Sequence, residues 1–131
     1  MQEFFNKYAQ ISLHGSPTEL AALYSSGYAI AGPKGAYGGL NDEAFLGWLK
    51  QVQQGSRDSG MRALRPSRVG GAVPVGPNHC LVEVEWAALF GEREVVFSIS
   101  YLLEKDGPRI LAYVSHEDQE DKMRAEGLQP S

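Results

Sequence analysis

The apolar residues of this 131-residue chain follow a helical period in its first half and an alternating period in its second. A helical period predicts a helix with one buried face, and alternation predicts a strand with one buried side. We expect one helix from about residue 2 to residue 13, where Phe4, Tyr8 and Ile11 share a face. Another begins after Asn41 or Asp42, and its apolar stripe consists of Ala44, Phe45, Trp48, Leu49 and Val52.

A short helix is expected between these two. The sequence SPTE at residues 16–19 offers a capping serine, a proline suited to the first helical position and a glutamate that completes a capping box. Leu20, Leu23 and Tyr24 then give this helix one apolar face.

The segment that follows is rich in glycine. Residues 25–40, SSGYAIAGPKGAYGGL, contain five glycines and one proline, both of which break regular structure. We therefore expect an irregular connection, in which residues 28–31 form at most a short strand, and which is the mobile lip of any cavity.

From Met61 onward, alternation predicts four strands at residues 61–69, 79–90, 93–104 and 109–117. The connections between them are GGAVPVGPN, the tight Gly91-Glu92 and Lys105-Asp106-Gly107, all typical of hairpins. Helices followed by consecutive hairpins predict an α+β fold in which three N-terminal helices cover one face of a strongly curved antiparallel sheet. We expect residues 1–131 to form a single domain, with residues 118–131 as a polar C-terminal tail.

The same alternation predicts which side chains face the helices. On the central strands, the inward set is Cys80, Val82, Val84, Trp86, Ala88, Phe90, Val95, Phe97, Ile99, Tyr101 and Leu103. Glu83 and Glu85 fall on the opposite, outward phase. Both phases of the last strand are apolar, so its pattern alone does not select an inner side.

Composition and net charge limit the classes of molecule that the chain is expected to bind. Hydrophobic residues make up 43% of the chain and charged residues 21%, which is typical of globular proteins and not of disordered ones. A formal charge of −4 at pH 7 leaves no basic footprint, so we expect neither nucleic acid nor a membrane as a partner. We also expect no signal peptide in MQEFFNKYAQ, which lacks the basic and apolar regions of one.

Cys80 is the single cysteine, which excludes an intrachain disulfide and a zinc site made of several thiolates. We expect it to be a small buried residue at the start of a strand. A reducing compartment suits such a chain, so we expect a cytoplasmic protein. We also expect no metal or other cofactor.

The order of the elements resembles the nuclear transport factor 2-like family, also called SnoaL-like or ketosteroid-isomerase-like. The segments that carry the resemblance are FFNKYAQISLHGSPTELAALYSSGYAI, FLGWLKQV and SISYLLEKDGPRILAYVSHED, within residues 1 to about 118. It implies a cone-shaped fold with a cavity between the helices and the concave sheet face, and frequent dimers through the sheet. It also implies that Leu111, Tyr113 and Ser115 are the inner residues of the last strand. Because the sheet is apolar on both faces, a homodimer through its outer face is expected.

Members of the family range from isomerases and dehydratases to proteins without catalysis, and fold alone does not choose among them. An isomerase needs a carboxylate base and a hydrogen-bond donor in the cavity. No acidic residue falls on the inner phase of the long strands, and the known catalytic motifs of the family do not map onto this chain. The remaining catalytic candidates are Tyr28 or Tyr101 as donor and, as base, His116 or an aspartate that the pattern does not place.

His116 lies in AYVSHEDQED, where four carboxylates follow it within five positions. Three roles stay open: a structural cap at the strand end, proton transfer at the mouth of the cavity, and a metal ligand. The two-histidine motif of zinc proteases is absent, since no second histidine follows four residues later.

The leading hypothesis is a protein that binds a small apolar or aromatic molecule. The expected ligand-binding residues are Tyr24, Tyr28, Trp48, Val84, Trp86, Phe97, Ile99, Tyr101 and Tyr113, because tyrosine and tryptophan bring polar tips into an apolar cavity. One alternative is an isomerase, dehydratase or lyase acting on a cyclic or polyketide-like substrate. Another is a protein-interaction module that uses the outer sheet face.

Overall fold

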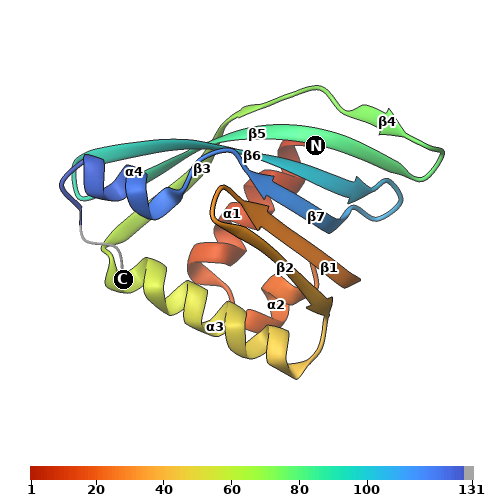
Figure 1. The fold of residues 1–131 in the computed structure, drawn as a ribbon, viewed down its shortest axis with the longest axis horizontal. Coiled ribbons are helices and arrows are strands. Elements are labelled where there is room, and N and C mark those ends of the chain that lie inside the picture. The colour runs from red at the N-terminus through yellow and green to blue at the C-terminus, as the bar shows by residue number, and fades with distance from the viewer. Residues whose placement is uncertain (129–131) are drawn as a thin grey trace.

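The computed structural model describes residues 1–128, in which four helices pack on one curved sheet of seven strands (Figure 1). The helices are α1 (Gln2–His14), α2 (Pro17–Ala21), α3 (Glu43–Asp58) and α4 (Gln119–Ala125). The strands are β1 (Tyr24–Gly32), β2 (Gly35–Leu40), β3 (Met61–Val69), β4 (Val73–Val75), β5 (His79–Phe90), β6 (Arg93–Glu104) and β7 (Arg109–Ser115). The predicted α+β architecture, with helices on a strongly curved sheet, is confirmed. None of the helices within the described residues is long and apolar enough to cross a membrane.

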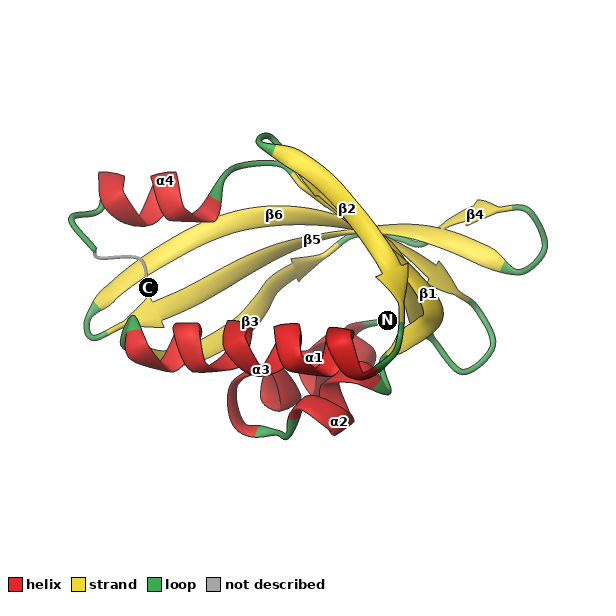
Figure 2. Ribbon diagram, turned by 60° about the horizontal axis from the view of Figure 1, so that its bottom comes forward, coloured by secondary structure: helices red, strands yellow, loops and turns green. Residues whose placement is uncertain are grey.

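The strands are arranged in the order β2-β1-β7-β6-β5-β3, and the short β4 pairs with β5 beside this path. Figure 2 shows the sheet arching over α1, α2 and α3, with α4 at the opposite end of the sheet from β4. The pairing of β1 with β7 is parallel, so the prediction of a purely antiparallel sheet was wrong for this pair of strands. Only strands joined by hairpins must be antiparallel, and β1 reaches β7 by a long crossover.

The glycine-rich segment forms regular structure, which corrects the prediction of an irregular connection. β1 and β2 make an antiparallel hairpin in which Tyr28 faces Gly39 and Ala29 faces Gly38. A Cβ atom at Gly38 would lie 2.6 Å from the carbonyl oxygen of Tyr28, so no larger residue fits there. The glycines therefore allow the two backbones to approach closely, in addition to forming turns. The segment between β3 and β5, expected to be a loop, likewise holds β4.

The second helix begins as predicted and ends earlier. Ser16 Oγ accepts a hydrogen bond from the Glu19 N–H at 3.1 Å, and Glu19 Oε1 accepts one from the Ser16 N–H at 3.0 Å, which is the expected capping box. The helix ends at Ala21, and Tyr24 opens β1, so the prediction that Tyr24 is helical was wrong. The side-chain amide of Asn41 donates to the carbonyls of Ala21 and Tyr24 at 2.9 and 3.3 Å, which holds the chain in this turn.

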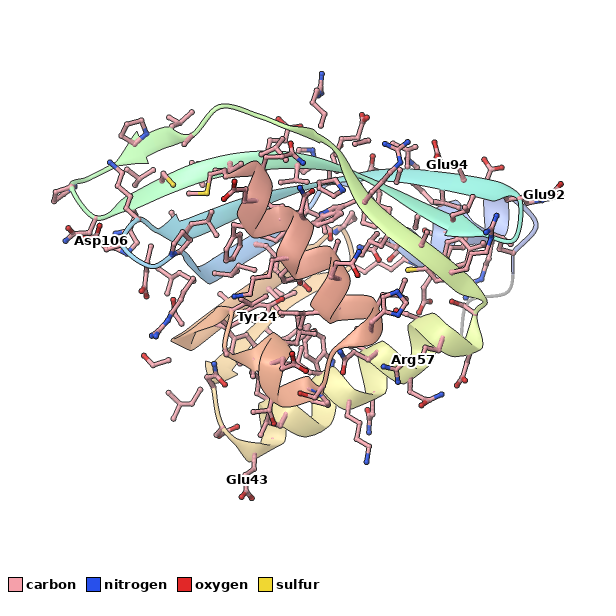
Figure 3. The ribbon with its side chains drawn as sticks, turned by 180° about the vertical axis from the view of Figure 1, so that it is seen from behind. Tyr24, Glu43, Arg57, Glu92, Glu94 and Asp106 are labelled. Atoms are coloured by element: carbon pink, nitrogen blue, oxygen red, sulfur yellow. The ribbon has the colours of Figure 1, made fainter. Side chains whose placement is uncertain are left out.

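Alternation correctly identified the inner face of the central strands. Every residue of the predicted inward set on β5 and β6 is between 0% and 8% exposed. Glu83 and Glu85 lie on the other face, as expected. The tight turn between the two strands uses Gly91 with a φ of 62°, a conformation that favours glycine. Figure 3 shows Tyr24 between the helices and the sheet, and the charged side chains of Glu43, Arg57, Glu92, Glu94 and Asp106 at the periphery.

The last strand changes phase in its middle, which corrects one predicted position. Leu103 pairs with Ile110, whereas the preceding Leu102 pairs with Ala112, so Leu111 is an extra residue in the ladder. Ile110 is fully buried and takes the inner position expected of Leu111. Beyond the bulge, Tyr113 pairs with Tyr101 and shares its inner side.

The C-terminal helix α4 was not predicted, because the sequence indicated only a polar tail. Asp118 caps it by accepting a hydrogen bond from the Asp121 N–H at 2.9 Å. Lys34, in the β1–β2 turn, lies 3.5 Å from a carboxylate oxygen of Asp118 and 3.1 Å from one of Asp121. The ammonium group of Lys122 donates to the carbonyl of Val96 on β6. These contacts attach α4 to the hairpin and to the sheet; residues 129–131 of the predicted tail lie outside the described residues.

Candidate functional site

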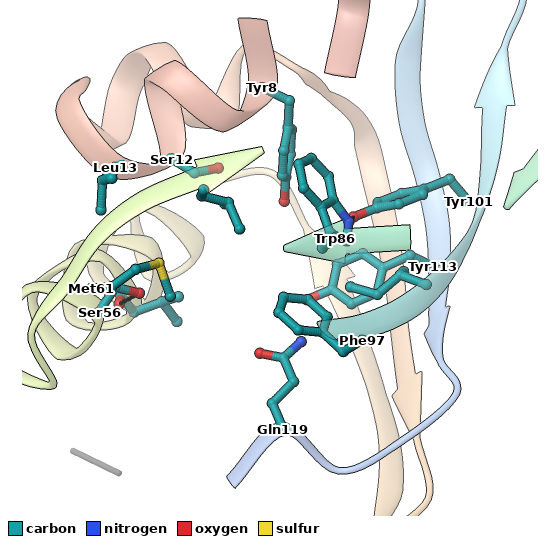
Figure 4. Close-up of a pocket in the computed structure, with 13 residues that line it drawn as sticks. Tyr8, Ser12, Leu13, Ser56, Met61, Trp86, Phe97, Tyr101, Tyr113 and Gln119 are labelled. Carbon is teal, nitrogen blue, oxygen red and sulfur yellow. Dashed lines mark hydrogen bonds between the residues drawn. The ribbon is translucent and has the colours of Figure 1, made fainter. Parts of the chain in front are cut away.

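A cavity of about 130 Å³ lies between the helices and the concave face of the sheet (Figure 4). We call it the aromatic cavity. Its walls come from α1, α3 and four strands, with one residue of α4 at the edge. The lining residues are Tyr8, Ser12, Leu13, Val52, Ser56, Met61, Leu64, Trp86, Phe97, Ile99, Tyr101, Tyr113 and Gln119.

Aromatic rings form much of the wall, and none of the described lining residues carries a charge. The ring of Tyr8 lies 5.9 Å from that of Trp86 and 6.2 Å from that of Tyr101, measured between centroids. Tyr101 and Tyr113, on neighbouring strands, have their ring centroids 5.6 Å apart. The cavity is therefore apolar, with a few hydroxyl and amide groups as its polar atoms.

Two hydrogen bonds fix the aromatic side chains. The indole N–H of Trp86 donates to the hydroxyl oxygen of Tyr101 at 2.9 Å. The hydroxyls of Tyr8 and Tyr24 are 2.7 Å apart, and either can be the donor. A buried tryptophan or tyrosine needs such a partner for its polar atom, so these bonds hold the rings in place around the cavity.

Burial keeps the phenols neutral. It raises the pKa of Tyr24, Tyr101 and Tyr113 well above the usual value of 10.0, and proximity to neighbouring tyrosines adds to the effect. Burial also raises the pKa of Tyr8, although hydrogen bonds with Tyr24 and Ser12 oppose the change. At neutral pH these groups donate hydrogen bonds and do not serve as bases.

The structure brings five of the sequence-predicted residues to the cavity, and they all lie on the long strands: Trp86, Phe97, Ile99, Tyr101 and Tyr113. Two others are core residues behind the wall. Val84 is fully buried, and Tyr24 is 4% exposed behind Tyr8. Val84 has the inward position that alternation predicted, and Tyr24 is buried at the start of β1, but neither residue lines the cavity.

Tyr28 and Trp48 are not in the lining, which corrects two predicted positions. The ring of Tyr28 stacks on Phe45 with 4.1 Å between centroids, and Trp48 stacks on Phe45 at 5.9 Å. Trp48 also meets Tyr37 edge-on at 5.5 Å. These rings join the β1–β2 hairpin to α3, away from the aromatic cavity, so the catalytic candidate Tyr28 has no access to it.

His116 lies on the outer face of the sheet, away from the cavity. Its Nε2 is 2.8 Å from Ser100 Oγ, and its Nδ1 is 3.7 Å from a carboxylate oxygen of Glu83. The candidate role as a base at the cavity mouth is therefore not supported, because strand phase directs the ring to the other side. Within residues 1–128, no group of three or more His, Cys, Asp or Glu side chains could hold a metal ion.

The residues that the sequence prediction missed come mainly from the helices and β3. They are Tyr8, which was expected on the apolar face of the first helix and not as a ligand contact, and Ser12, Leu13, Val52, Ser56, Met61, Leu64 and Gln119. A signal existed on the helices, since Ser12 follows Tyr8 by four positions and Ser56 follows Val52 by four. Gln119 had no such signal, because α4 was not expected.

No protein-family model matches the sequence, and neither does any protein of curated function. Solved structures do resemble the fold. A hypothetical protein with a ketosteroid isomerase-like fold from Catenulispora acidiphila, crystallised with trimethylamine, aligns with a TM-score of 0.59 and 16% identity over 97% of this chain and 94% of that chain. A nuclear transport factor 2-like protein of unknown function from Shewanella oneidensis aligns with a TM-score of 0.67 and 12% identity over 88% and 94%.

A domain of unknown function with a cystatin-like fold from Nostoc punctiforme aligns with a TM-score of 0.65 and 15% identity over 96% of this chain and 81% of that one. The chain therefore has the nuclear transport factor 2-like fold that the resemblance implied, which is described as cystatin-like in the Nostoc protein. At sequence identities this low, the structural similarity establishes the fold but not the function, which has to be argued from the residues of the site.

Proposed function

We propose that this protein binds a compact, mainly apolar or aromatic small molecule in the aromatic cavity. The observation that carries the proposal is an uncharged, ring-lined hollow that the core does not fill. Sites for small molecules are concave and mostly apolar, with a few placed polar groups. At about 130 Å³ the hollow is close to the engineered cavity of about 150 Å³ that binds benzene, so we expect a ligand of similar size.

The size of the cavity favours this proposal over the alternative of a polyketide-like substrate, because a molecule of several fused rings exceeds it. The crystallised relative from Catenulispora acidiphila is in complex with trimethylamine, a small molecule, which is compatible with a small ligand here. An isomerase would also need a base beside the substrate. The described lining residues include no carboxylate or histidine, so binding is the function that this geometry supports better.

We also propose a homodimer through the outer face of the sheet. Leu81 and Val114 are 43% and 50% exposed there, although both are apolar. A second copy would cover them, and the same face could otherwise receive a different protein. Light scattering should report a dimer for the native protein and a monomer for Leu81→Glu, while Leu40→Glu, an exposed site on β2, should remain dimeric. A monomeric native protein would exclude the dimer.

Cys80 is 1% exposed and is the single thiol of the sequence, which suits a reducing environment. A cytoplasmic location is accordingly part of the proposal. Fluorescent fusions in cells test it directly.

Binding can be tested by thermal unfolding with benzene, phenol and cyclohexanone. A ligand at 100 times its Kd should stabilise the protein by about 2.7 kcal/mol, which is visible as a higher Tm. Ser12→Phe places a ring in the aromatic cavity and should abolish the shift. Gln10→Phe places the same ring on the exposed side of α1 and should keep it. The proposal fails if no small molecule raises the Tm, or if both variants respond alike.

A further inference from the structure

The hydroxyl of Tyr113 is a polar group on the sheet wall of the cavity that the fold leaves without a hydrogen-bond partner. Within the described residues it makes no hydrogen bond, whereas the hydroxyls of Tyr8 and Tyr24 bond each other. Gln53 Oε1 is a polar atom that is both unpartnered and fully enclosed. The Tyr113 hydroxyl is unpartnered but not enclosed in this way, and its side chain lines the cavity, so a ligand there can reach it. An unpaired donor at the wall of an apolar site specifies part of a ligand.

Tyr101 adds a second available proton beside the first. Its oxygen accepts the indole N–H of Trp86, and its own O–H donates to no described residue. Tyr101 and Tyr113 face each other on adjacent strands, and both line the cavity. Figure 4 shows the Tyr101, Tyr113 and Trp86 side chains together on one wall, with the amide of Gln119 directed toward Phe97.

We infer, building on the proposed function, that the ligand is a neutral molecule of about one six-membered ring that carries a hydrogen-bond acceptor, such as a carbonyl oxygen, directed at the Tyr113 hydroxyl. A purely apolar ligand would expel water from this hydroxyl and leave it unsatisfied, which is costly in a buried site. A cation fits poorly, because the described lining offers no carboxylate to balance the charge, and a buried charge without a partner is disfavoured. The aromatic faces would offset only part of that cost.

An isosteric pair of probes tests this inference. Cyclohexanone and methylenecyclohexane share their shape and differ in whether the exocyclic atom accepts a hydrogen bond. Titration followed by protein NMR gives a Kd for each. We expect cyclohexanone to bind the native protein about 3- to 10-fold more tightly than the alkene, the range that one hydrogen bond supplies.

Tyr113→Phe should remove that preference by weakening cyclohexanone binding and leaving the alkene unchanged. Tyr28→Phe is the matched control: its hydroxyl also lacks a partner in the described chain but lies outside the lining, so the preference should persist. Equal binding of the two probes to the native protein would overturn the inference without any variant. Tighter binding of tetramethylammonium than of cyclohexanone would overturn it in favour of a cation. If no probe binds, the proposed function fails together with the inference.

Discussion

The indole N–H of Trp86 donates to the hydroxyl oxygen of Tyr101, 2.9 Å away, and each residue is 1% exposed. Tyr101→Phe would leave this buried donor unpaired, so we expect the free energy of unfolding to fall by about 1–3 kcal/mol. Urea denaturation measures the change. Tyr28→Phe removes the same atom where no hydrogen bond is lost and should change stability by less than about 0.5 kcal/mol. Equal effects would mean that the indole finds another partner.

Alkaline pH should destabilise the protein. Below pH 10 the phenols of Tyr24, Tyr101 and Tyr113 are protonated in both the native and the unfolded state, so they add no pH dependence. Above it they ionise in the unfolded chain, while burial keeps them protonated in the native state by raising their pKa. The unfolded state then binds fewer protons, and stability falls with rising pH by about 1.4 kcal/mol per pH unit for each such tyrosine.

Urea denaturation at pH 8, 10 and 11 checks this dependence. Tyr113→Phe should show a shallower decline than the native protein, because one of the titrating groups is gone. A stability that is constant up to pH 11 would contradict the prediction.

Gln53 ties α3 to the end of α1. It is 3% exposed, and its Nε2 donates to the carbonyls of Ile11 and Gly15, both at 3.1 Å. Gln53→Met keeps the length of the side chain and leaves the Gly15 carbonyl without its donor, whereas the Ile11 carbonyl keeps the Gly15 N–H at 2.9 Å, so we expect a loss of about 1–3 kcal/mol in the free energy of unfolding. The neighbouring Gln54 is exposed and bonds only Asp58, so Gln54→Met should cost less than about 0.5 kcal/mol. If Gln53→Met lowers the free energy of unfolding no more than Gln54→Met does, the hydrogen bonds of Gln53 to α1 contribute nothing to stability.

Lys34 should control the attachment of α4. Lys34→Ala removes both ion pairs to Asp118 and Asp121, so hydrogen exchange of residues 119–125 should become faster, as measured by mass spectrometry. High salt should accelerate the same amides in the native protein, because it screens exposed charges. Arg65→Ala breaks another exposed ion pair, with Glu94, and should leave these amides unchanged. Unchanged slow exchange of these amides in Lys34→Ala would assign the attachment of α4 to Lys122 and to Met123, which packs against the core, instead.

The long strands were predictable because one side of each is buried and the other is not. A shift of one residue would bring Glu83 and Glu85 inward, so the pattern admits a single phase. The β1–β2 hairpin escaped prediction because glycine is normally read as a sign of turns. At Gly38 it is required by the approaching carbonyl of Tyr28, a contact that exists only after the strands have paired.

The aromatic cavity was only partly predictable for a related reason. Periodicity tells which side chains point inward, but it does not tell whether the space before them is filled. Tyr28 on β1 and Trp48 on α3 both stack on Phe45, and neither lines the cavity. Tyr113 entered the prediction through the family resemblance, and the bulge at Leu111 is what allows it and Ile110 to face the same side.

The parallel pairing of β1 with β7 has a consequence for synthesis. Residues 24–32 leave the ribosome well before their sheet neighbour at residues 109–115. Until residues 109–115 have been made, the β1–β2 hairpin has no sheet edge to join. A chain truncated before residue 115 would therefore leave strand edges of the sheet unpaired. Unpaired edges of this kind promote aggregation and are one reason why chaperones are needed.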